Sequence, residues 1–266
     1  MSITLENLRR DARMRIESDS QMSAAWIIVP ILPLIGLILL FVSIFAASFA
    51  TFRTFNATSG PTTGVSPAFG AVFALVIFVE LGIFAVFIVF AIMLYKLVKR
   101  RNTHFSRQMF LYEDLINSAK ELAAKKGVDI ALPLNNLDRT YREARVEETE
   151  KSAALWAILC FITGIATLYV YYFLMKDFFK HERKEELFFE DLNRALITAG
   201  ITMNLPRRTV PIPDRSFILY FILGLVTAGI FYIYWIYVLL EDPNNHFRQQ
   251  AMIEDTIISQ VTPLLS

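Results

Sequence analysis

The stretch AAWIIVPILPLIGLILLFVSIFAASFA, residues 24–50, contains no charged side chain. A membrane-spanning helix needs about 20 consecutive apolar residues, because the hydrocarbon core of a bilayer is about 30 Å thick. Residues 71–95 form a second run of this kind, in which Glu80 is the only ionisable residue before the terminal tyrosine. The two runs predict two transmembrane helices, at about 24–50 and 71–95.

Residues 51–70 separate the two predicted helices and are rich in Gly, Pro, Ser and Thr. Clusters of these residues are typical of loops. The segment has Arg53 as its only charge and contains the glycosylation sequon Asn56-Ala57-Thr58. We therefore expect an exposed loop on the outer side of the membrane.

The composition supports an integral membrane protein and argues against several other classes. Of the 266 residues, 55% are hydrophobic and 19% are charged, which is more apolar than an ordinary soluble domain. A net charge of +1 excludes a nucleic-acid binder driven by bulk charge. Cys160 is the only cysteine, which excludes a disulfide framework or a thiolate metal cluster. Because nucleotide-binding and hydrolase motifs are absent from the sequence, we expect a protein that is not an enzyme, with no cofactor.

Two later apolar segments, residues 152–175 and 216–240, allow two interpretations. Their 24 and 25 residues suffice to cross a bilayer once but not twice. Each segment has a weak point near its middle, at Thr163-Gly164 and at Thr227-Ala228-Gly229. Basic residues favour the cytoplasmic side, and the 12 in residues 96–151 and the 8 in residues 176–215 share that side only if both segments are re-entrant hairpins. This favours hairpins over two ordinary crossings, and the second interpretation stays open.

The chain also repeats itself. All three histidines, His104, His181 and His246, lie nine residues after a tyrosine. A shift of 65 residues without a gap superposes His181 on His246, together with the preceding glycine, isoleucine and two tyrosines. A shift of 130 residues superposes Trp26 on Trp156, together with nearby arginines and a glutamate. Such self-similarity indicates repeated structural units.

We therefore predict an all-α integral membrane protein built from three repeated modules. Each module has a membrane segment or hairpin followed by cytoplasmic amphipathic helices, and residues 1–23 form a cytoplasmic N-terminal segment. The modules are residues 24–133, with a cytoplasmic helix at 105–126; residues 134–206, with membrane segment 152–175 and a cytoplasmic helix at 182–199; and residues 207–266, with membrane segment 216–240 and a C-terminal tail. The two cytoplasmic helices should lie near or on the bilayer and stop at Gly127 and Gly200.

We expect a multi-pass protein of the cell membrane, with its N-terminus and polar modules in the cytoplasm. Its partners should be the lipid bilayer and either further copies of the chain or other membrane proteins, but no nucleic acid. A basic cluster directly follows the second span, where such side chains reach anionic lipid. The predicted lipid-headgroup contacts are Lys96, Lys99, Arg100 and Arg101.

The sequence from Asp214-Arg215-Ser216 through Thr227-Ala228-Gly229-Ile230-Phe231 to Tyr234-Trp235 resembles a family of small prokaryotic membrane domains of unknown function. The shared pattern is an Arg-Ser start, a central Thr-x-Gly-Ile-aromatic and a following aromatic-Trp. It covers residues 214–245 and, more faintly, residues 151–181. The resemblance implies a compact membrane module and transfers no activity or site.

The three histidines allow two interpretations. Imidazole is the commonest protein ligand for transition metals, so packing of the modules would bring His104, His181 and His246 together at a metal or haem site. However, Glu113 follows His104 by nine residues and therefore faces the opposite side of a helix. We accordingly expect no metal site, and we expect three separate histidines that bond carbonyls or lipid phosphates at the membrane boundary.

Glu80 inside the second span is a functional hypothesis by default, because a carboxyl group in the bilayer is costly. We expect a structural glutamate that contacts Ser43 or Ser48 of the first helix. The protein should then be a structural, scaffolding or accessory membrane subunit, whose wedge-like hairpins also suit it to shaping the membrane. The alternatives are a small-solute or ion transporter or channel component that uses Glu80, and a metal- or haem-binding protein that uses the histidines.

Overall fold

The computed structural model describes residues 2–57 and 67–266, and every element in these ranges is a helix. The chain divides into two compact units, Ala25–Met93 and Met1–Ala24 together with Leu94–Ser266. The elements are α1 (Ile3–Ser18), η1 (Ala24–Ile27), α2 (Ile28–Ala57), α3 (Pro67–Lys126), α4 (Ala131–Glu147), α5 (Ala153–Thr163), α6 (Ala166–Thr198), α7 (Phe217–Val226) and α8 (Ile230–Leu265).

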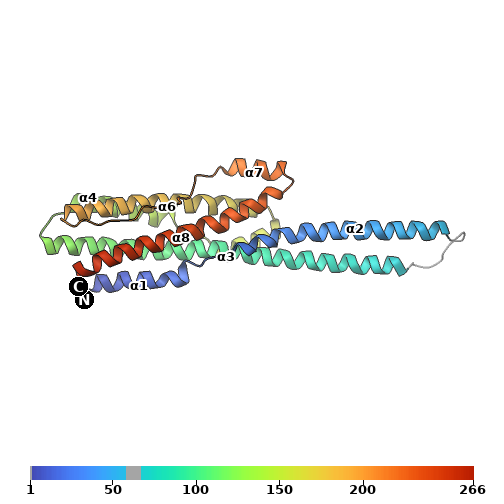
Figure 1. The fold of residues 1–266 in the computed structure, drawn as a ribbon, viewed down its shortest axis with the longest axis horizontal. Coiled ribbons are helices and arrows are strands. Elements are labelled where there is room, and N and C mark those ends of the chain that lie inside the picture. Colours follow the sequence, from blue (N-terminus) through green and yellow to red (C-terminus); the bar gives the residue numbers. More distant parts are fainter. Residues whose placement is uncertain (1, 58–66) are drawn as a thin grey trace. The chain divides into compact units, whose positions relative to one another are not determined.

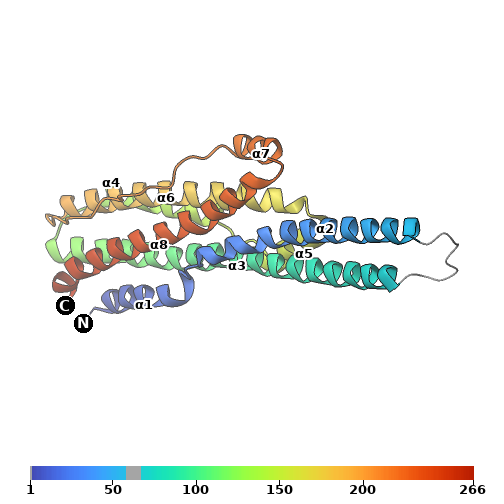
Figure 2. The same cartoon turned by 45° about the vertical axis from the view of Figure 1, so that its right-hand side comes forward.

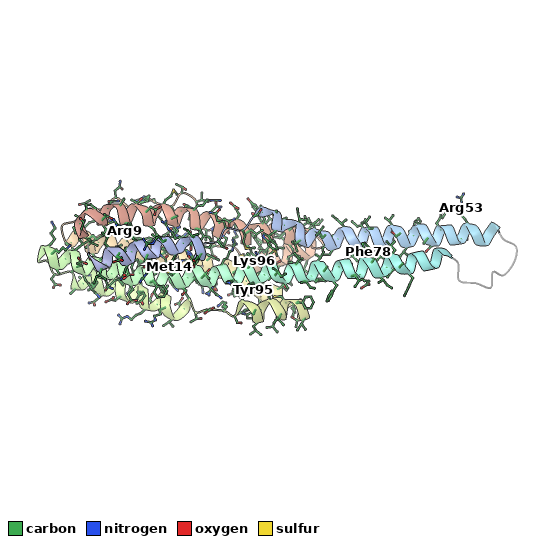
Figure 3. All side chains as sticks on the ribbon, turned by 90° about the horizontal axis from the view of Figure 1, so that it is seen from below. Arg9, Met14, Arg53, Phe78, Tyr95 and Lys96 are labelled. Carbon is green, nitrogen blue, oxygen red and sulfur yellow. The ribbon has the colours of Figure 1, made fainter. Side chains whose placement is uncertain are left out.

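The unit Ala25–Met93 is a hairpin of α2 and the first half of α3, which lie side by side in opposite directions (Figures 1 and 2). Both helices are long and apolar enough to cross a membrane. Their large apolar side chains point outward, and Phe78 is 75% exposed (Figure 3). Gly36 marks a close approach, since a Cβ atom there would lie 3.6 Å from the side chain of Ile83.

The helices of this hairpin reach further than the sequence predicted. α2 continues to Ala57 and α3 begins at Pro67, so both ends of the predicted loop at 51–70 are helical. Thr and Ser at the ends of this segment do not stop the helices, because the residues beside them in the sequence are apolar or aromatic. Residues 58–66, and with them Thr58 of the sequon, lie outside the described residues.

The other unit is a helical bundle with three long helices, the part of α3 from Leu94, α6 and α8, that run in the same direction (Figure 1). Three segments run back along them: α1, α4 and the irregular residues 199–216 (Figures 1 and 2). A large apolar cluster joins all of these segments. It includes Leu8, Leu115, Leu137, Phe188, Ile201 and Ile257, each at most 6% exposed.

The helices predicted at 105–126 and 182–199 are not separate elements. They are the second halves of α3 and α6, and their apolar faces are buried in the bundle, as Leu111 and Leu192 show. In the region predicted as a C-terminal tail, α8 continues to Leu265. Ile253, Ile257 and Val261 recur at helical spacing and form a buried stripe that holds this part of α8 in the core.

The predicted stops at Gly127 and Gly200 are confirmed. α3 ends one residue before Gly127, which has φ +64°, and α6 ends shortly before Gly200, which has φ +74°. At both ends the residue after the glycine donates its N–H to a carbonyl five residues earlier, which satisfies a carbonyl left free by the helix.

The segments 152–175 and 216–240 are each broken into two helices at the predicted weak points. The chain turns at Gly164, between α5 and α6, and at Ala228-Gly229, between α7 and α8, all with positive φ. α5 packs back on α6, with the Trp156 and Tyr169 rings 5.0 Å apart. α5 and α7 have 11 and 10 residues, so they are about 15–17 Å long at 1.5 Å per residue. This is about half the thickness of the hydrocarbon core of a bilayer.

Arg100 and Arg101 do not contact lipid headgroups, because both side chains are buried, at 2% and 1% exposure. Arg101 on α3 pairs with Asp177 on α6 at 2.9 Å and donates to the Thr149 carbonyl at 2.7 Å. Lys96 and Lys99 face outward and are exposed. The sequence alone does not distinguish them from the two inward-facing arginines, because the positions of the partner helices are needed to tell which side is buried. A headgroup contact for the two lysines stays a prediction.

Arg100 compensates for a proline in another helix. Pro243 lies inside α8 and has no N–H to donate to the Leu239 carbonyl four residues earlier. The Arg100 guanidinium donates to this carbonyl at 2.5 Å and to the Asn244 side chain at 3.1 Å. The bond therefore ties α3 to α8 at the place where the backbone of α8 is short of a donor.

Arg100→Gln should lower the Tm of the protein in detergent by roughly 5–10 °C, because hydrogen bonds to charged groups contribute about 1.5–3 kcal/mol each. Pro243→Ala supplies a backbone N–H for the same carbonyl. Thermal unfolding of the single and double variants should therefore show a smaller loss from Arg100→Gln in the Pro243→Ala background. Lys99→Gln, on the exposed face of the same turn, is the control and should change Tm little. Equal losses in both backgrounds would contradict the role given to Arg100.

Candidate metal centre

The three histidines meet in the middle of the bundle. His104 on α3, His181 on α6 and His246 on α8 are completely buried, and their ring centroids lie 5.1, 5.1 and 5.4 Å apart. The Nε2 atom of His104 is 3.2 Å from Nε2 of His181 and 3.1 Å from Nε2 of His246. One imidazole from each long helix therefore points its Nε2 atom to a common centre.

The Nδ1 atom of each histidine contacts a carboxylate on the outer side of the ring. The partners are Asp19 for His104 at 2.9 Å, Glu148 for His181 at 2.8 Å and Glu182 for His246 at 2.9 Å. Nδ1 of His246 also lies 3.4 Å from the Arg208 guanidinium. An ionised carboxylate accepts hydrogen bonds only, so its partner Nδ1 carries the proton and the Nε2 of that ring presents a lone pair. With all three carboxylates ionised, this places three lone pairs against each other in the centre.

Electrostatics favour ionised carboxylates at Asp19 and Glu148, whereas burial raises the pKa of Glu182. Burial raises the pKa of Asp19, but His104 and Arg107 outweigh this and lower the pKa below its ordinary value. The pKa of Glu148 is likewise lowered by His181 and Lys184 against the effect of burial. Burial lowers the pKa of His104 to about 4 and that of His246 well below its ordinary value. Neutral imidazole is the form that binds metal ions.

The geometry fits a single transition-metal ion. Two imidazole nitrogens bound to tetrahedral zinc at about 2.0–2.1 Å lie about 3.3–3.4 Å from each other. The two distances from His104, 3.1 and 3.2 Å, need an outward movement of only a few tenths of an ångström, and one ligand nitrogen from each of the three rings lies within 4.8 Å of the others. A hydrogen bond from the outer nitrogen to a carboxylate is the usual support for a metal-binding histidine. The same distances leave no room for the porphyrin plane between the rings, so the arrangement does not fit haem.

Aromatic rings shield the centre from water. Phe105 stacks on His181 with ring centroids 4.2 Å apart and an interplanar angle of 18°. Phe247 and Phe178 lie against His104, with centroids 4.6 and 6.4 Å away. Electrostatic interactions are stronger where water is excluded. The repulsion among the three lone pairs is therefore large, and so is its relief by a directly bound cation.

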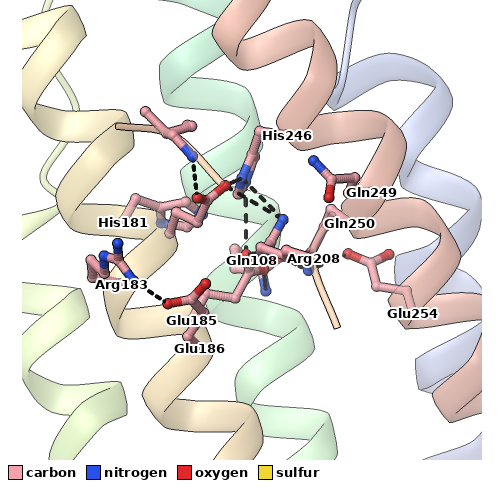
Figure 4. Close-up of polar contacts among 12 residues, drawn as sticks. Gln108, His181, Arg183, Glu185, Glu186, Arg208, His246, Gln249, Gln250 and Glu254 are labelled. Atoms are coloured by element: carbon pink, nitrogen blue, oxygen red, sulfur yellow. Dashed lines mark hydrogen bonds and ion pairs between the residues drawn. The ribbon is translucent and has the colours of Figure 1, made fainter. Parts of the chain in front are cut away.

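A second polar layer lies one helical turn further along each long helix. It consists of Gln108, Glu185 and Gln250, four residues after the respective histidines. The Gln108 side chain donates to Glu185 at 2.8 Å, and burial raises the pKa of Glu185 to about 7. Arg208 from residues 199–216 pairs with Glu185 and donates to Gln250 at 2.7 Å (Figure 4).

Arg107 completes the polar core by bridging two carboxylates. Its guanidinium donates to Asp19 at 3.0 Å and to both oxygens of Glu254 at 2.9 and 2.8 Å. Asp19 therefore accepts from Arg107 with one oxygen and from His104 with the other. Arg107 thereby holds the carboxylate that orients a candidate metal ligand.

The expectation that the histidines act separately at the membrane boundary is wrong, because all three are buried and within contact of each other. The nine-residue spacing between His104 and Glu113 excludes a contact only between groups on the same helix. The actual partners of His104 and His181 are Asp19, just after α1, and Glu148, just after α4. The shift that superposes Trp26 on Trp156 brings Asp19 within one position of Glu148, which relates the two residues but does not reveal that they bind histidines.

Glu80 lies on the exposed surface of α3 in the hairpin unit. Ser43 and Ser48 donate their hydroxyls to the Leu39 and Ile44 carbonyls of their own helix, at 2.7 and 2.8 Å. Within the described residues, the predicted contact of Glu80 with Ser43 or Ser48 is not formed. Serine in an apolar helix has this local acceptor available, and sequence alone does not reveal that it is used.

Comparison with known proteins gives one match. The model of a family described as a domain of unknown function, DUF4234, matches residues 215–263. This range contains α7 and most of α8, including His246, and it confirms the resemblance seen in residues 214–245. No curated protein and no solved structure matches the chain.

Proposed function

We propose that this protein is a metal-binding membrane protein whose three histidines hold one divalent transition-metal ion. The observation that carries the proposal is the convergence of three buried Nε2 atoms, each on a ring whose Nδ1 is bonded to a carboxylate. Zn²⁺ is the ion that best suits three imidazoles in this geometry. The three carboxylates supply negative charge that offsets the charge of the ion.

The ion would act as a structural clamp. Each ligand comes from a different long helix, so binding joins α3, α6 and α8 at one level. Structural zinc sites have four ligands. Glu185 would supply the fourth by moving Oε2, which lies 3.8 Å from Nε2 of His246, away from its ion pair with Arg208. Because the unfolded chain cannot assemble this set, the free energy of metal binding adds to the stability of the fold.

The proposal includes the topology expected from the sequence. In it, the three long helices and the segments that run back along them are three copies of one module, and the hairpins α5–α6 and α7–α8 enter one leaflet and return. His181 and His246 each follow their hairpin glycine, Gly164 or Gly229, by 17 residues, which is about 25 Å along a helix. The metal centre then lies on the cytoplasmic side, outside the hydrocarbon region.

A clamp of this kind suits a structural or accessory subunit that holds a rigid cytoplasmic bundle against the membrane. In that role the chain would associate with further copies or with other membrane proteins. A transport function centred on Glu80 is not favoured by any contact in the described residues.

The metal site predicts that apo protein, prepared with a chelator, takes up one Zn²⁺ per chain. At a free Zn²⁺ concentration 100 times Kd, binding should stabilise the protein by about 2.7 kcal/mol and raise Tm accordingly. His104→Gln, His181→Gln and His246→Gln should each weaken binding at least 100-fold, and Asp19→Asn about 10–100-fold. Titration calorimetry and metal analysis measure these changes.

Cys160→Ser is the matched control, since it removes the only thiol without touching the centre. It should keep full binding. Circular dichroism of each variant checks that the helices remain. Wild-type protein that takes up no ion, or histidine variants that bind as well as wild type, would contradict the metal site.

The topology predicts which sites are labelled by a membrane-impermeant thiol reagent in intact cells. In a Cys160→Ser background, Arg53→Cys should react because it would lie outside. Asn117→Cys and Thr198→Cys should be protected until the membrane is opened, because both would be cytoplasmic; all three native side chains are exposed on the protein. Labelling of Thr198→Cys, with Asn117→Cys still protected, would show that residues 152–175 cross the membrane once.

A further inference from the structure

A groove lies beside the metal centre, between α1, α3 and the end of α4. It has a volume of about 450 Å³. Met14 and Glu17 come from α1, Ser106 and Arg107 from α3, and Glu148 and Glu150 from the residues that follow α4. The groove is wide enough for an ion with its water shell.

The inner wall of the groove consists of residues that touch the histidines. Glu148 accepts the hydrogen bond from His181, and Phe105, which also lines the groove, stacks on the same ring. Arg107 holds Asp19, which is bonded to His104. One layer of side chains therefore separates the groove from two of the three candidate ligands.

Two buried polar atoms in this wall lack a hydrogen-bond partner among the described residues. They are Oε1 of Glu148, whose side chain is 6% exposed, and Nε of Arg107, whose side chain is 1% exposed. The Lys184 ammonium lies 3.6 Å from this oxygen. Glu148 thus faces His181 with one oxygen and has spare acceptor capacity on the other.

The charges of the groove suit a cation. Glu17 and Glu150 are exposed beside the buried Glu148, and carboxylate oxygens replace water readily around a divalent ion. The positive charge of Arg107 is balanced by Asp19 and Glu254. Arg145 also lines the groove, and Lys184 lies 3.6 Å from Glu148. Three carboxylates therefore face two arginines in the lining, and an arriving ion meets carboxylate oxygens before it meets imidazole.

We propose that this groove is the port through which a hydrated divalent metal ion reaches the three histidines, with Glu148 as the carboxylate that first receives it beside the His181 ring. The inference rests on the metal site proposed above. In the transfer the ion exchanges bound water for Nε2 of the histidines, and Glu148 returns to its bond with Nδ1 of His181. No covalent bond is formed or broken in the protein.

Filling the groove should slow metal exchange without changing affinity. Ser106 is exposed on α3 and lines the groove, so Ser106→Trp should slow both uptake of Zn²⁺ by apo protein and its release to a chelator at least 10-fold, while Kd stays within 2-fold. Met14→Trp fills the groove from α1 and should act in the same way. Lys120→Trp, exposed on the same helix away from the groove, should exchange at the wild-type rate. Stopped-flow measurement with a fluorescent zinc indicator gives both rates.

A second pair of variants distinguishes two roles of a carboxylate: admitting the ion through the groove, and orienting a metal-binding histidine. Glu148→Gln and Asp19→Asn each weaken one carboxylate–histidine bond, but only Glu148 lines the groove. Glu148→Gln should lower the uptake rate, whereas Asp19→Asn should mainly raise the release rate. Wild-type exchange rates in both tryptophan variants would overturn the port and leave the metal site standing. Failure of wild-type protein to bind Zn²⁺ would overturn the metal site itself.

Discussion

Three imidazole lone pairs that point at one another in a dry core are the constraint on which the rest of this structure depends. Each Nδ1 contacts a carboxylate, and among residues 2–57 and 67–266 the Nε2 atoms have no hydrogen-bond donor beyond one another. Such an arrangement is costly without positive charge at its centre. A bound cation removes the cost and turns the same atoms into its ligands, which is why we assign the centre to a metal.

The bundle is built so that the histidines meet. α3, α6 and α8 run in the same direction, and the layer formed by Gln108, Glu185 and Gln250 repeats the register of the histidines one turn later. A large apolar cluster lies on one side of these layers and includes Leu115. On the other side, the bond from Arg100 to the Leu239 carbonyl fixes α8 where Pro243 interrupts its hydrogen bonds.

The sequence predicts the helical class, the two long apolar helices, the break points of the shorter segments and the glycine stops, because each depends on local composition or on a single glycine. It does not predict that Arg100 is buried, since its partner carbonyl lies in a helix 139 residues away. The repeated spacing after tyrosine allows the meeting of the histidines as one alternative, but the sequence favours three separate histidines, which is wrong. The carboxylates that bind His104 and His181 are not predicted, because Asp19 and Glu148 belong to segments that run back along the bundle. In the sequence, these two residues are related only by lying one position apart after a shift of 130 residues.

X-ray absorption at the zinc edge of the purified, Zn²⁺-loaded protein tests the metal centre most directly. The structure predicts three imidazole nitrogens at about 2.0–2.1 Å, with the outer-shell scattering typical of histidine rings and a remaining light-atom ligand. The same spectrum should lose its imidazole scattering when His104, His181 and His246 are all replaced by glutamine. A wild-type spectrum without imidazole scattering, or one that the triple replacement leaves unchanged, would show that the ion is held elsewhere and would contradict the account.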